Sequence, residues 1–235
     1  MSNFFFRFKQ FTVYQDRCAM KVGTDGVLLG AWTPVDGVRR ILDVGTGTGL
    51  VALMLAQRTG VDVPIDAVEV DSAAAEQARD NFQRSPWNVR LSVIAGDFNT
   101  FHRDYRYDLI VSNPPYFADG LQCPDKQRDL ARHNHLLTYE NLFKQTSSLL
   151  TEEGAFTLII PAEVSDRVEE IAALNDLYPV RQLLVVTKQG KKPKRTLITF
   201  TRQLQHCQQE TMFMEDNFHH YSTKYEALTK DYYLK

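Results

Sequence analysis

Residues 109–116 have the sequence LIVSNPPY, and the fold of this chain is organised around them. The apolar run 109–111 is typical of a buried parallel strand. Two consecutive prolines then prevent the strand from continuing as ladder or helix and fix a rigid turn at its carboxyl end. In an open α/β sheet, ligands bind at that end of the strands. The stretch therefore predicts a parallel sheet and also the edge at which its ligand lies.

The same turn groups three features that suit a flat ligand carrying an amino group. The side-chain oxygen of Asn113 and the backbone carbonyl of Pro114 can accept its two protons, while the ring of Tyr116 stacks on its face. Taken alone, these residues are explained equally well by an ordinary turn at a strand end. The rest of the chain has to decide between the two interpretations.

Strand and helix patterns alternate on both sides of this turn, which indicates a doubly wound α/β fold. We expect a Rossmann-like, seven-stranded, mostly parallel sheet. Its strands are predicted at 41–44, 65–70, 91–94, 109–112, 155–160, 180–187 and 196–201. Helices are predicted at 49–58, 72–84, 138–150 and 164–174.

The chain divides into three parts. Residues 1–34 form an N-terminal extension, with a strand or hairpin pattern in 4–14 and a helix that Thr24 could cap. Residues 35–202 form the main α/β domain, and residues 203–235 form a tail whose aromatic side chains dock it on the body. Base stacking by these aromatics is the less favoured alternative.

Composition restricts the class of protein. Hydrophobic residues make up 43% and charged residues 24%, as in soluble globular proteins. The net charge is −2, so a nucleic acid would have to bind a local basic patch. Three widely spaced cysteines without a CxxC pair, and His133 and His135 at an unusual spacing for ligands, argue against a metal site. Without an apolar span or a signal peptide, we expect a cytoplasmic protein with no membrane contact.

A glycine-rich turn, DVGTGTG, occupies residues 43–49 after the first predicted strand. Such a turn lets a ligand approach the backbone N–H groups at a helix N-terminus. A dinucleotide fingerprint would have its third glycine at position 50, where this chain has Leu50. The acid ahead of the glycines would also repel a pyrophosphate and attract a cation, such as the amino group of a methionine moiety. The expected cofactor contacts here are Asp43, Gly45, Thr46, Gly47 and Gly49.

Further acidic residues follow the next predicted strands. Glu69 and Asp71 end the second strand, where a carboxylate can accept hydrogen bonds from both ribose hydroxyls. Glu69 is our first choice, because Asp71 could cap the next helix together with Ser72. Asp97 follows the third strand and is placed to accept from an adenine amino group. Asp25 is a further candidate near the methionine end, although a role in the first turn of its helix explains it equally well.

With these motifs in this order, the chain resembles the class I S-adenosylmethionine-dependent methyltransferases in which NPPY receives an amino group conjugated to a π system. The resemblance covers residues 20–202 and implies S-adenosylmethionine as the cofactor of domain 35–202. Residues 8–11, 20–26, 113–117 and 131–133 are similar to those of the bacterial tRNA(Val) adenine-N6-methyltransferases. That resemblance implies a tRNA substrate, methylated on the purine 3′ of the anticodon, with Asn113, Pro114 and Tyr116 at the target amine.

A basic cluster supports a nucleic-acid partner. Residues 188–202 hold six Lys and Arg and no acid, and Gly190 and Pro193 indicate a hairpin loop between two strands. We expect this loop to contact RNA phosphates, with help from an arginine in the loop after NPPY. The expected contacts are Lys188, Lys191, Lys192, Lys194, Arg195 and Arg132.

Three alternatives stay open. A protein glutamine-amide N-methyltransferase also uses NPPY, but such enzymes carry a helical domain ahead of the glycine turn, where this chain has a β pattern. A DNA adenine methyltransferase would need a target-recognition domain that we do not find. A non-catalytic RNA-binding protein of the same fold is disfavoured by the intact NPPY. We expect a monomer that transfers methyl groups to adenine N6 in tRNA.

Overall fold

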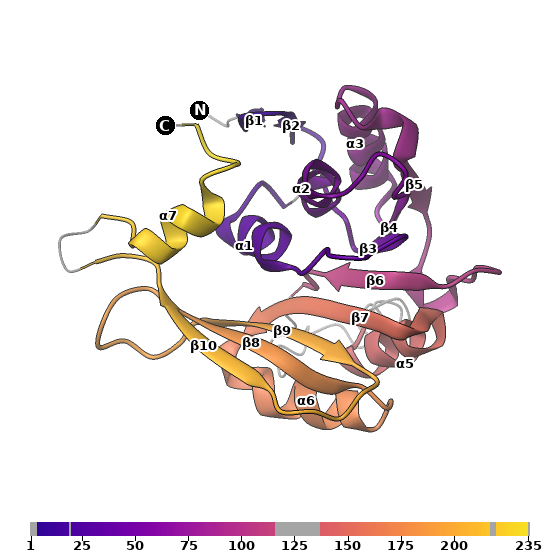
Figure 1. Ribbon diagram of the computed structural model, residues 1–235. Coiled ribbons are helices and arrows are strands. Elements are labelled where there is room, and N and C mark those ends of the chain that lie inside the picture. Colours follow the sequence, from indigo (N-terminus) through magenta and orange to yellow (C-terminus); the bar gives the residue numbers. More distant parts are fainter. Residues whose placement is uncertain (1–3, 19, 116–136, 217–219, 235) are drawn as a thin grey trace, which may run out of the picture.

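A computed structural model describes residues 4–18, 20–115, 137–216 and 220–234. An eight-stranded sheet forms its centre, with the strand order β10-β8-β9-β7-β6-β3-β4-β5 (Figure 1). The seven predicted strands are all present in it. They are β3 (Ile41–Val44), β4 (Ile65–Glu69), β5 (Leu91–Ala95), β6 (Tyr107–Ser112), β7 (Leu150–Pro161), β8 (Tyr178–Val186) and β9 (Arg195–Thr201).

The sheet has one strand more than the seven expected, because the tail adds an edge strand. β10 (Gln208–Phe213) pairs in parallel with β8. Of its six residues only Met212 is buried. The alternation of apolar and polar residues that indicates a half-buried strand is therefore missing from the sequence of β10.

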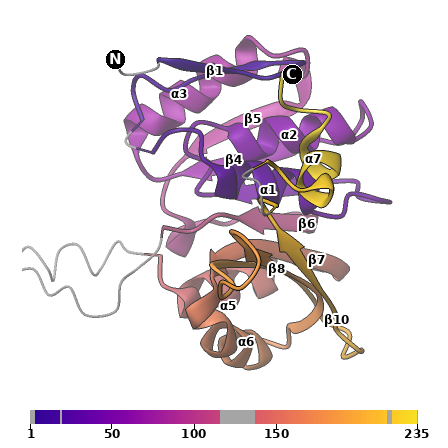
Figure 2. The same cartoon turned by 90° about the vertical axis from the view of Figure 1, so that its left-hand side faces the viewer.

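Strand directions decide where a ligand can bind. β3, β4, β5, β6 and β7 run parallel to one another, and β8 runs parallel to β10. β9 runs antiparallel to both β7 and β8. Within the described sheet, the carboxyl ends of every strand except β9 therefore lie at one edge, together with the loop between β8 and β9. We call this the ligand edge; Figure 2 views it face on.

Two hydrophobic cores cover the two faces of the sheet. Neighbouring residues on a strand point to opposite faces, so Leu109 belongs to one core and Ile110 to the other. α1 (Thr24–Trp32), α2 (Leu50–Arg58) and α7 (Thr223–Thr229) pack on the first face, on the same side as α3 (Ser72–Gln83) (Figure 1). α5 (Tyr139–Leu149) and α6 (Ser165–Ala173) pack on the second. Burial on both faces explains why the central strands β3, β4 and β6 are mostly apolar in sequence.

The N-terminal hairpin and the tail pack against each other. β1 (Phe5–Arg7) and β2 (Thr12–Tyr14) form the expected antiparallel hairpin. The backbone N–H of Lys9 donates to the carbonyl of Tyr232 at 2.8 Å, and the rings of Phe8 and Tyr233 stack with centroids 6.0 Å apart. Tail residues are thus part of the core around the first residues of the chain.

The structure decides the caps of two helices. Gly23, not Thr24, is the N-cap of α1, and it makes no side-chain cap bond. Of the two candidates at the start of α3, Asp71 is the cap, and its carboxylate accepts from the backbone N–H of Ala74 at 2.7 Å. Asp and Ser are both strong cap formers, so the sequence alone could not choose between them. None of the helices in the described ranges is long and apolar enough to cross a membrane.

Candidate active site at the ligand edge

Two adjoining cavities open at the ligand edge, with volumes of about 260 and 310 Å³. The first lies over the ends of β4 and β5, and the second lies between the glycine turn and the amino end of α1. Met20, Gly45, Gly47 and Asn113 line both of them. One elongated ligand could therefore occupy the two cavities and pass Asn113 at their junction.

The glycine turn needs glycine for two different reasons. Gly47 has a φ of 55°, and a Cβ there would meet nothing within 4 Å, so this side of the turn is open to a ligand. Gly49 has a φ of 84°, and a Cβ there would lie 2.5 Å from the ring of Phe82. The first glycine leaves room at the cavity, and the second lets α2 start close to α3.

Asp43 is buried beneath this turn. Its Oδ2 accepts a hydrogen bond from Thr46 Oγ1 at 2.6 Å and another from the backbone N–H of Ala52 at 3.2 Å. Burial raises the pKa of Asp43 to about 7, against the opposing effect of the two hydrogen bonds, and the nearby charge of Glu69 adds to the rise. The residue fixes the turn and belongs to the wall of the second cavity.

Glu69 and Asp71 have different environments. The buried carboxylate of Glu69 accepts from the backbone N–H of Gly47 at 2.8 Å through Oε2 and from that of Asp71 at 3.0 Å through Oε1. The carboxylate of Asp71 is engaged as the cap of α3. Glu69 is thus held rigidly at the floor of the first cavity with lone pairs still available, and this geometry favours it as the acceptor for a diol.

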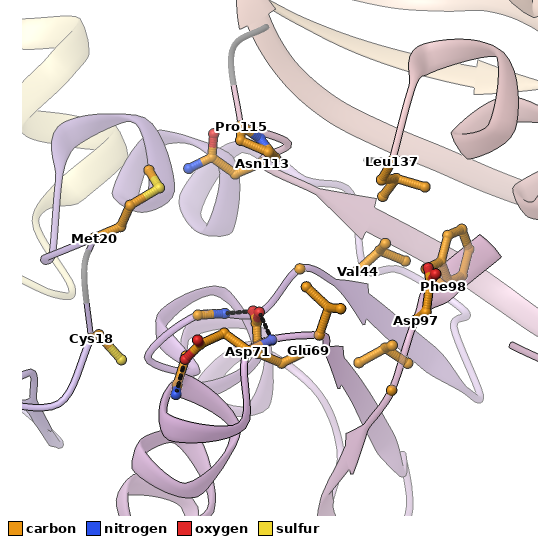
Figure 3. Close-up of a pocket in the computed structure, with 16 residues that line it drawn as sticks. Cys18, Met20, Val44, Glu69, Asp71, Asp97, Phe98, Asn113, Pro115 and Leu137 are labelled. Carbon is orange, nitrogen blue, oxygen red and sulfur yellow. Dashed lines mark hydrogen bonds between the residues drawn. The ribbon is translucent and has the colours of Figure 1, made fainter. Parts of the chain in front are cut away.

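An apolar slot continues from Glu69 across the first cavity (Figure 3). Asp97 caps a short turn, Phe98–Thr100, and accepts from the backbone N–H of Asn99 at 2.8 Å. The ring of Phe98 lies beside that carboxylate, and Leu137 faces both from the start of the α5 segment. A slot with apolar walls and one acceptor at its end suits a flat base with an exocyclic amine.

Asn113 lies at the junction of the two cavities, across from Glu69 and Asp71 (Figure 3). It is half-buried, and the next residue, Pro114, is buried. Ser112 Oγ donates to the carbonyl of Val44 at 2.9 Å, which ties the end of β6 to the end of β3. Tyr116 and Arg132, which we also expected at the site, lie outside the described residues.

Asp25 and Arg195 form an ion pair that the sequence did not suggest. We expected the first at the cofactor and the second on RNA, but Arg195 Nε donates to Asp25 Oδ2 at 2.8 Å. Each side chain is 26% exposed. The pair holds the amino end of α1, which lines the second cavity, to the first residue of β9. Its contact joins residues 170 positions apart, so no local pattern could reveal it.

The basic loop between β8 and β9 is a hairpin loop, as predicted, and lies at the ligand edge (Figure 2). Lys191, Lys192 and Lys194 are exposed, and Lys188 is half-buried. With Thr187 these four lysines line a surface hollow of about 340 Å³. Arg202 is the last basic residue of the cluster, and it donates instead to the backbone carbonyl of Ser147 in α5.

Cys18 and Met20 belong to the cavity walls but were not among the expected site residues. Burial raises the pKa of the Cys18 thiol to about 11, and the charges of Glu69 and Asp71 add to the rise. The thiol therefore stays protonated at neutral pH and is a poor nucleophile there. Across the residues that the structure describes, no three His, Cys, Asp or Glu side chains are grouped to hold a metal ion.

The chemistry of the site follows from these placements. Acidic groups surround the cavities, at Asp25, Asp43, Glu69, Asp71 and Asp97, and they favour a cationic ligand. A diol acceptor, an apolar slot for a base and an amine acceptor lie in sequence along one edge. The site suits a positively charged nucleoside derivative whose reactive group points to Asn113.

Known proteins match both the sequence and the fold. The family described as Methyltransferase small domain matches residues 22–181. A protein of Bacteroides thetaiotaomicron named tRNA1(Val) (adenine(37)-N6)-methyltransferase is 57% identical, covering 100% of this chain and 99% of its own length. A protein of Pectobacterium carotovorum with the same name is 46% identical, covering 97% of this chain and 93% of its own.

Solved structures agree at the level of the fold alone. A crystal structure of a predicted O-methyltransferase from Agrobacterium tumefaciens has a TM-score of 0.67 at 19% identity, covering 88% of this chain and 96% of that one. A putative RNA methyltransferase from Pyrococcus horikoshii has a TM-score of 0.54 at 18% identity, covering 74% and 79%. Together with the family match and the full-length relatives, these findings identify the chain as a member of the Methyltransferase small domain family, within the group of bacterial proteins named tRNA1(Val) (adenine(37)-N6)-methyltransferase.

Proposed function

We propose that this protein transfers a methyl group from S-adenosylmethionine to the N6 amino group of an adenine in tRNA, at position 37 of a valine tRNA. The observation that carries the proposal is Asn113 at the junction of the two cavities, in a chain 57% identical over its length to a protein named for this reaction. A glutamine-amide methyltransferase would use a similar turn. The lysines at the same edge favour an RNA substrate instead.

In this proposal the cofactor spans both cavities. The methionine part lies against the glycine turn, with its ammonium group attracted by Asp43 and the turn N–H groups near its carboxylate. Glu69 accepts the ribose hydroxyls, while Asp97 accepts from the adenine amine and Phe98 packs beside the ring. Asp71 and Asp25 act on the site indirectly. Asp71 caps α3, and Asp25 anchors α1 through its ion pair with Arg195. The cationic sulfonium then lies near Asn113, among acidic residues that stabilise its charge.

The target amine is a weak nucleophile, because its lone pair is delocalised into the adenine ring. Hydrogen bonds from the two N6 protons to the Asn113 oxygen and the Pro114 carbonyl draw the nitrogen toward tetrahedral geometry and localise that pair. Bound S-adenosylmethionine would supply an electrophilic methyl group for this nitrogen, with a neutral thioether as its leaving group. The positively charged product amine loses one proton to solvent. Alignment of the two reactants can supply about 7–11 kcal/mol of the barrier reduction.

Tyr116 completes this proposed site by stacking on the extruded base. Stacking of this kind contributes about 1–3 kcal/mol per base and offsets part of the unstacking free energy in the anticodon loop. The exposed lysines 191, 192 and 194 and the half-buried Lys188 hold phosphates of the same loop, with Arg132 as a further phosphate contact. Arg195 is not among these phosphate contacts in our proposal, because it pairs with Asp25 and so anchors α1.

Substitution of Asn113 tests this function. Wild-type protein, labelled S-adenosylmethionine and a valine tRNA transcript should give N6-methyladenine, and a transcript with guanine at the target position should not. Asn113→Ala should lower turnover about 100- to 1,000-fold, as when one stabilising hydrogen bond is lost at other active sites. Its cofactor affinity, measured by calorimetry, should stay near that of the wild type. Methylated glutamine in place of methylated adenine would instead establish the rival substrate.

We further propose that the protein acts as a cytoplasmic monomer. Within the described residues, one copy of the chain carries the two cavities, the turn at residues 113–115, which we call the amine turn, and the basic loop, and this supports a site formed by a single copy. Light scattering of the purified protein with and without tRNA tests this point.

A further inference from the structure

An exposed tyrosine lies beside the basic loop. Tyr221 is 57% exposed, and its ring centroid is 4.8 Å from that of Tyr225, with an angle of 34° between the rings. Tyr225 is only 3% exposed and belongs to the first core. The Tyr221 ring therefore packs against a fixed ring on one side and presents its other side to solvent. Because its side chain is already held in place, it would lose little conformational entropy when a further ring stacks on it.

The backbone around Tyr221 is also held. Residues 213–216 and 220–222 form a hairpin after β10, which we call the tyrosine hairpin. Glu215 and Tyr221 pair as an antiparallel bridge, and the backbone N–H of Ser222 donates to the carbonyl of Met214 at 2.8 Å. Ser222 then caps α7. The ring is thus fixed between a strand and a helix that both pack on the body.

The tyrosine hairpin runs next to the basic loop. The backbone N–H groups of Met214 and Glu215 donate to the carbonyls of Val186 and Thr187 at 2.8 and 3.0 Å. Along the ligand edge, the strand order β6-β7-β9-β8-β10 brings the amine turn, the basic loop and the tyrosine hairpin into one row (Figure 2). At about 4.8 Å per strand, the hairpin lies roughly 19 Å from the amine turn. That distance is within the reach of one RNA loop.

The charges of the two neighbours differ. Lys188, Lys191, Lys192 and Lys194 give the loop a charge suited to phosphates. The tyrosine hairpin carries Glu215 and Asp216, and the carboxylate of Asp216 lies 3.5 Å from Nδ1 of His220. These acids disfavour a phosphate contact at the hairpin. The part of the hairpin that suits RNA is therefore the uncharged face of the Tyr221 ring.

We propose that Tyr221 stacks on an unpaired base of the substrate RNA, at a second contact separated from the target adenine, while the lysines hold the phosphates between the two. This inference rests on the proposed function, since it takes tRNA as the substrate. It assigns to the tyrosine hairpin a role in substrate affinity through an uncharged contact, beside the charged contact of the loop.

Binding measured across a range of salt concentrations tests the proposal, because a stacking contact and a phosphate contact respond differently to salt. Tyr221→Ala should weaken tRNA binding by at least about fivefold, the lower end of the effect for one stacked base. Its slope of log K against log salt should equal that of the wild type, since no phosphate contact is lost. Tyr221→Phe should bind as the wild type does. Phe4→Ala removes another exposed aromatic ring, on the N-terminal hairpin, and serves as the matched control with no expected change.

A second variant reports stacking directly. Tyr221→Trp should show fluorescence quenching on addition of tRNA, in excess of any change in wild-type protein, and the thermal unfolding midpoint of each variant checks folding. Wild-type affinity in Tyr221→Ala, or a flattened salt slope, or an unquenched Tyr221→Trp that still binds tRNA would overturn the stacking role. Methylation of tRNA by the wild-type protein is scored separately, so failure of this contact is distinguishable from failure of the proposed function.

Discussion

At the scale of single residues, the proposed contact of Asp43 with the cofactor predicts that cofactor binding depends on pH. Burial raises its pKa to about 7, so the group takes up a proton as the pH falls through that value. The proposed contact with an ammonium group requires the deprotonated form. Affinity for S-adenosylmethionine should therefore rise from pH 6 to pH 7 and level off by pH 8. In Asp43→Asn, whose amide oxygen can still accept from Thr46 and Ala52, binding should be weaker and flat over this range. Calorimetry in buffers across the range measures both profiles, and parallel profiles for the two proteins would exclude Asp43 as the titrating group.

At the scale of elements, the β8–β9 connection combines two kinds of basic residue that should respond differently to substitution. Changing Lys191, Lys192 and Lys194 together to alanine should weaken tRNA binding and reduce the salt slope by roughly 2–3 units if each lysine contacts one phosphate. Cofactor affinity should not change. Arg195→Ala should instead weaken cofactor binding, because α1 loses its anchor at Asp25, and should leave the salt slope of tRNA binding unaltered. Filter binding and calorimetry on both variants give the comparison. The assignment fails if the lysine variant keeps the wild-type slope or if Arg195→Ala flattens it.

At the scale of the whole molecule, the tail after residue 202 shares its core with the rest of the chain. Met212, Tyr225 and Tyr232 of the tail are each at most 3% exposed and belong to the first core. Removing a large buried side chain typically lowers the free energy of unfolding by about 3–5 kcal/mol, and a domain has only about 5–15 in total. We therefore propose that the three parts unfold as one unit, and that a protein ending at residue 202 shows no cooperative thermal transition. Tyr232→Ala, a milder change, should remain folded with a lower midpoint. A cooperative transition at the wild-type temperature in the shortened protein would contradict this proposal, because it would show that the rest of the chain folds without the tail.

These three scales also differ in what the sequence could predict. The central strands β3, β4 and β6 are predictable because they are buried on both faces and are mostly apolar. The glycine turn and NPPY are local sequence motifs, and they predict at which edge of the sheet the ligand binds. β10 has one buried residue and gave no such signal. The pairing of Asp25 with Arg195 depends on how α1 packs on the sheet, and the choice of Asp71 over Ser72 as the cap of α3 lies between two adjacent cap formers.

The contact between Lys9 and Tyr232 has a consequence for how the protein is made. A ribosome synthesises residues 8–11 long before residues 232 and 233, so the aromatic cluster that joins them stays incomplete until the tail has been made. Phe8 and Phe11, both buried in the finished protein, remain without their last partners until then. Final closure of this core therefore waits for the synthesis of residues 232 and 233. A ribosome that stalls within the tail leaves an N-terminal hairpin with an exposed aromatic face, which is the kind of surface that chaperones bind.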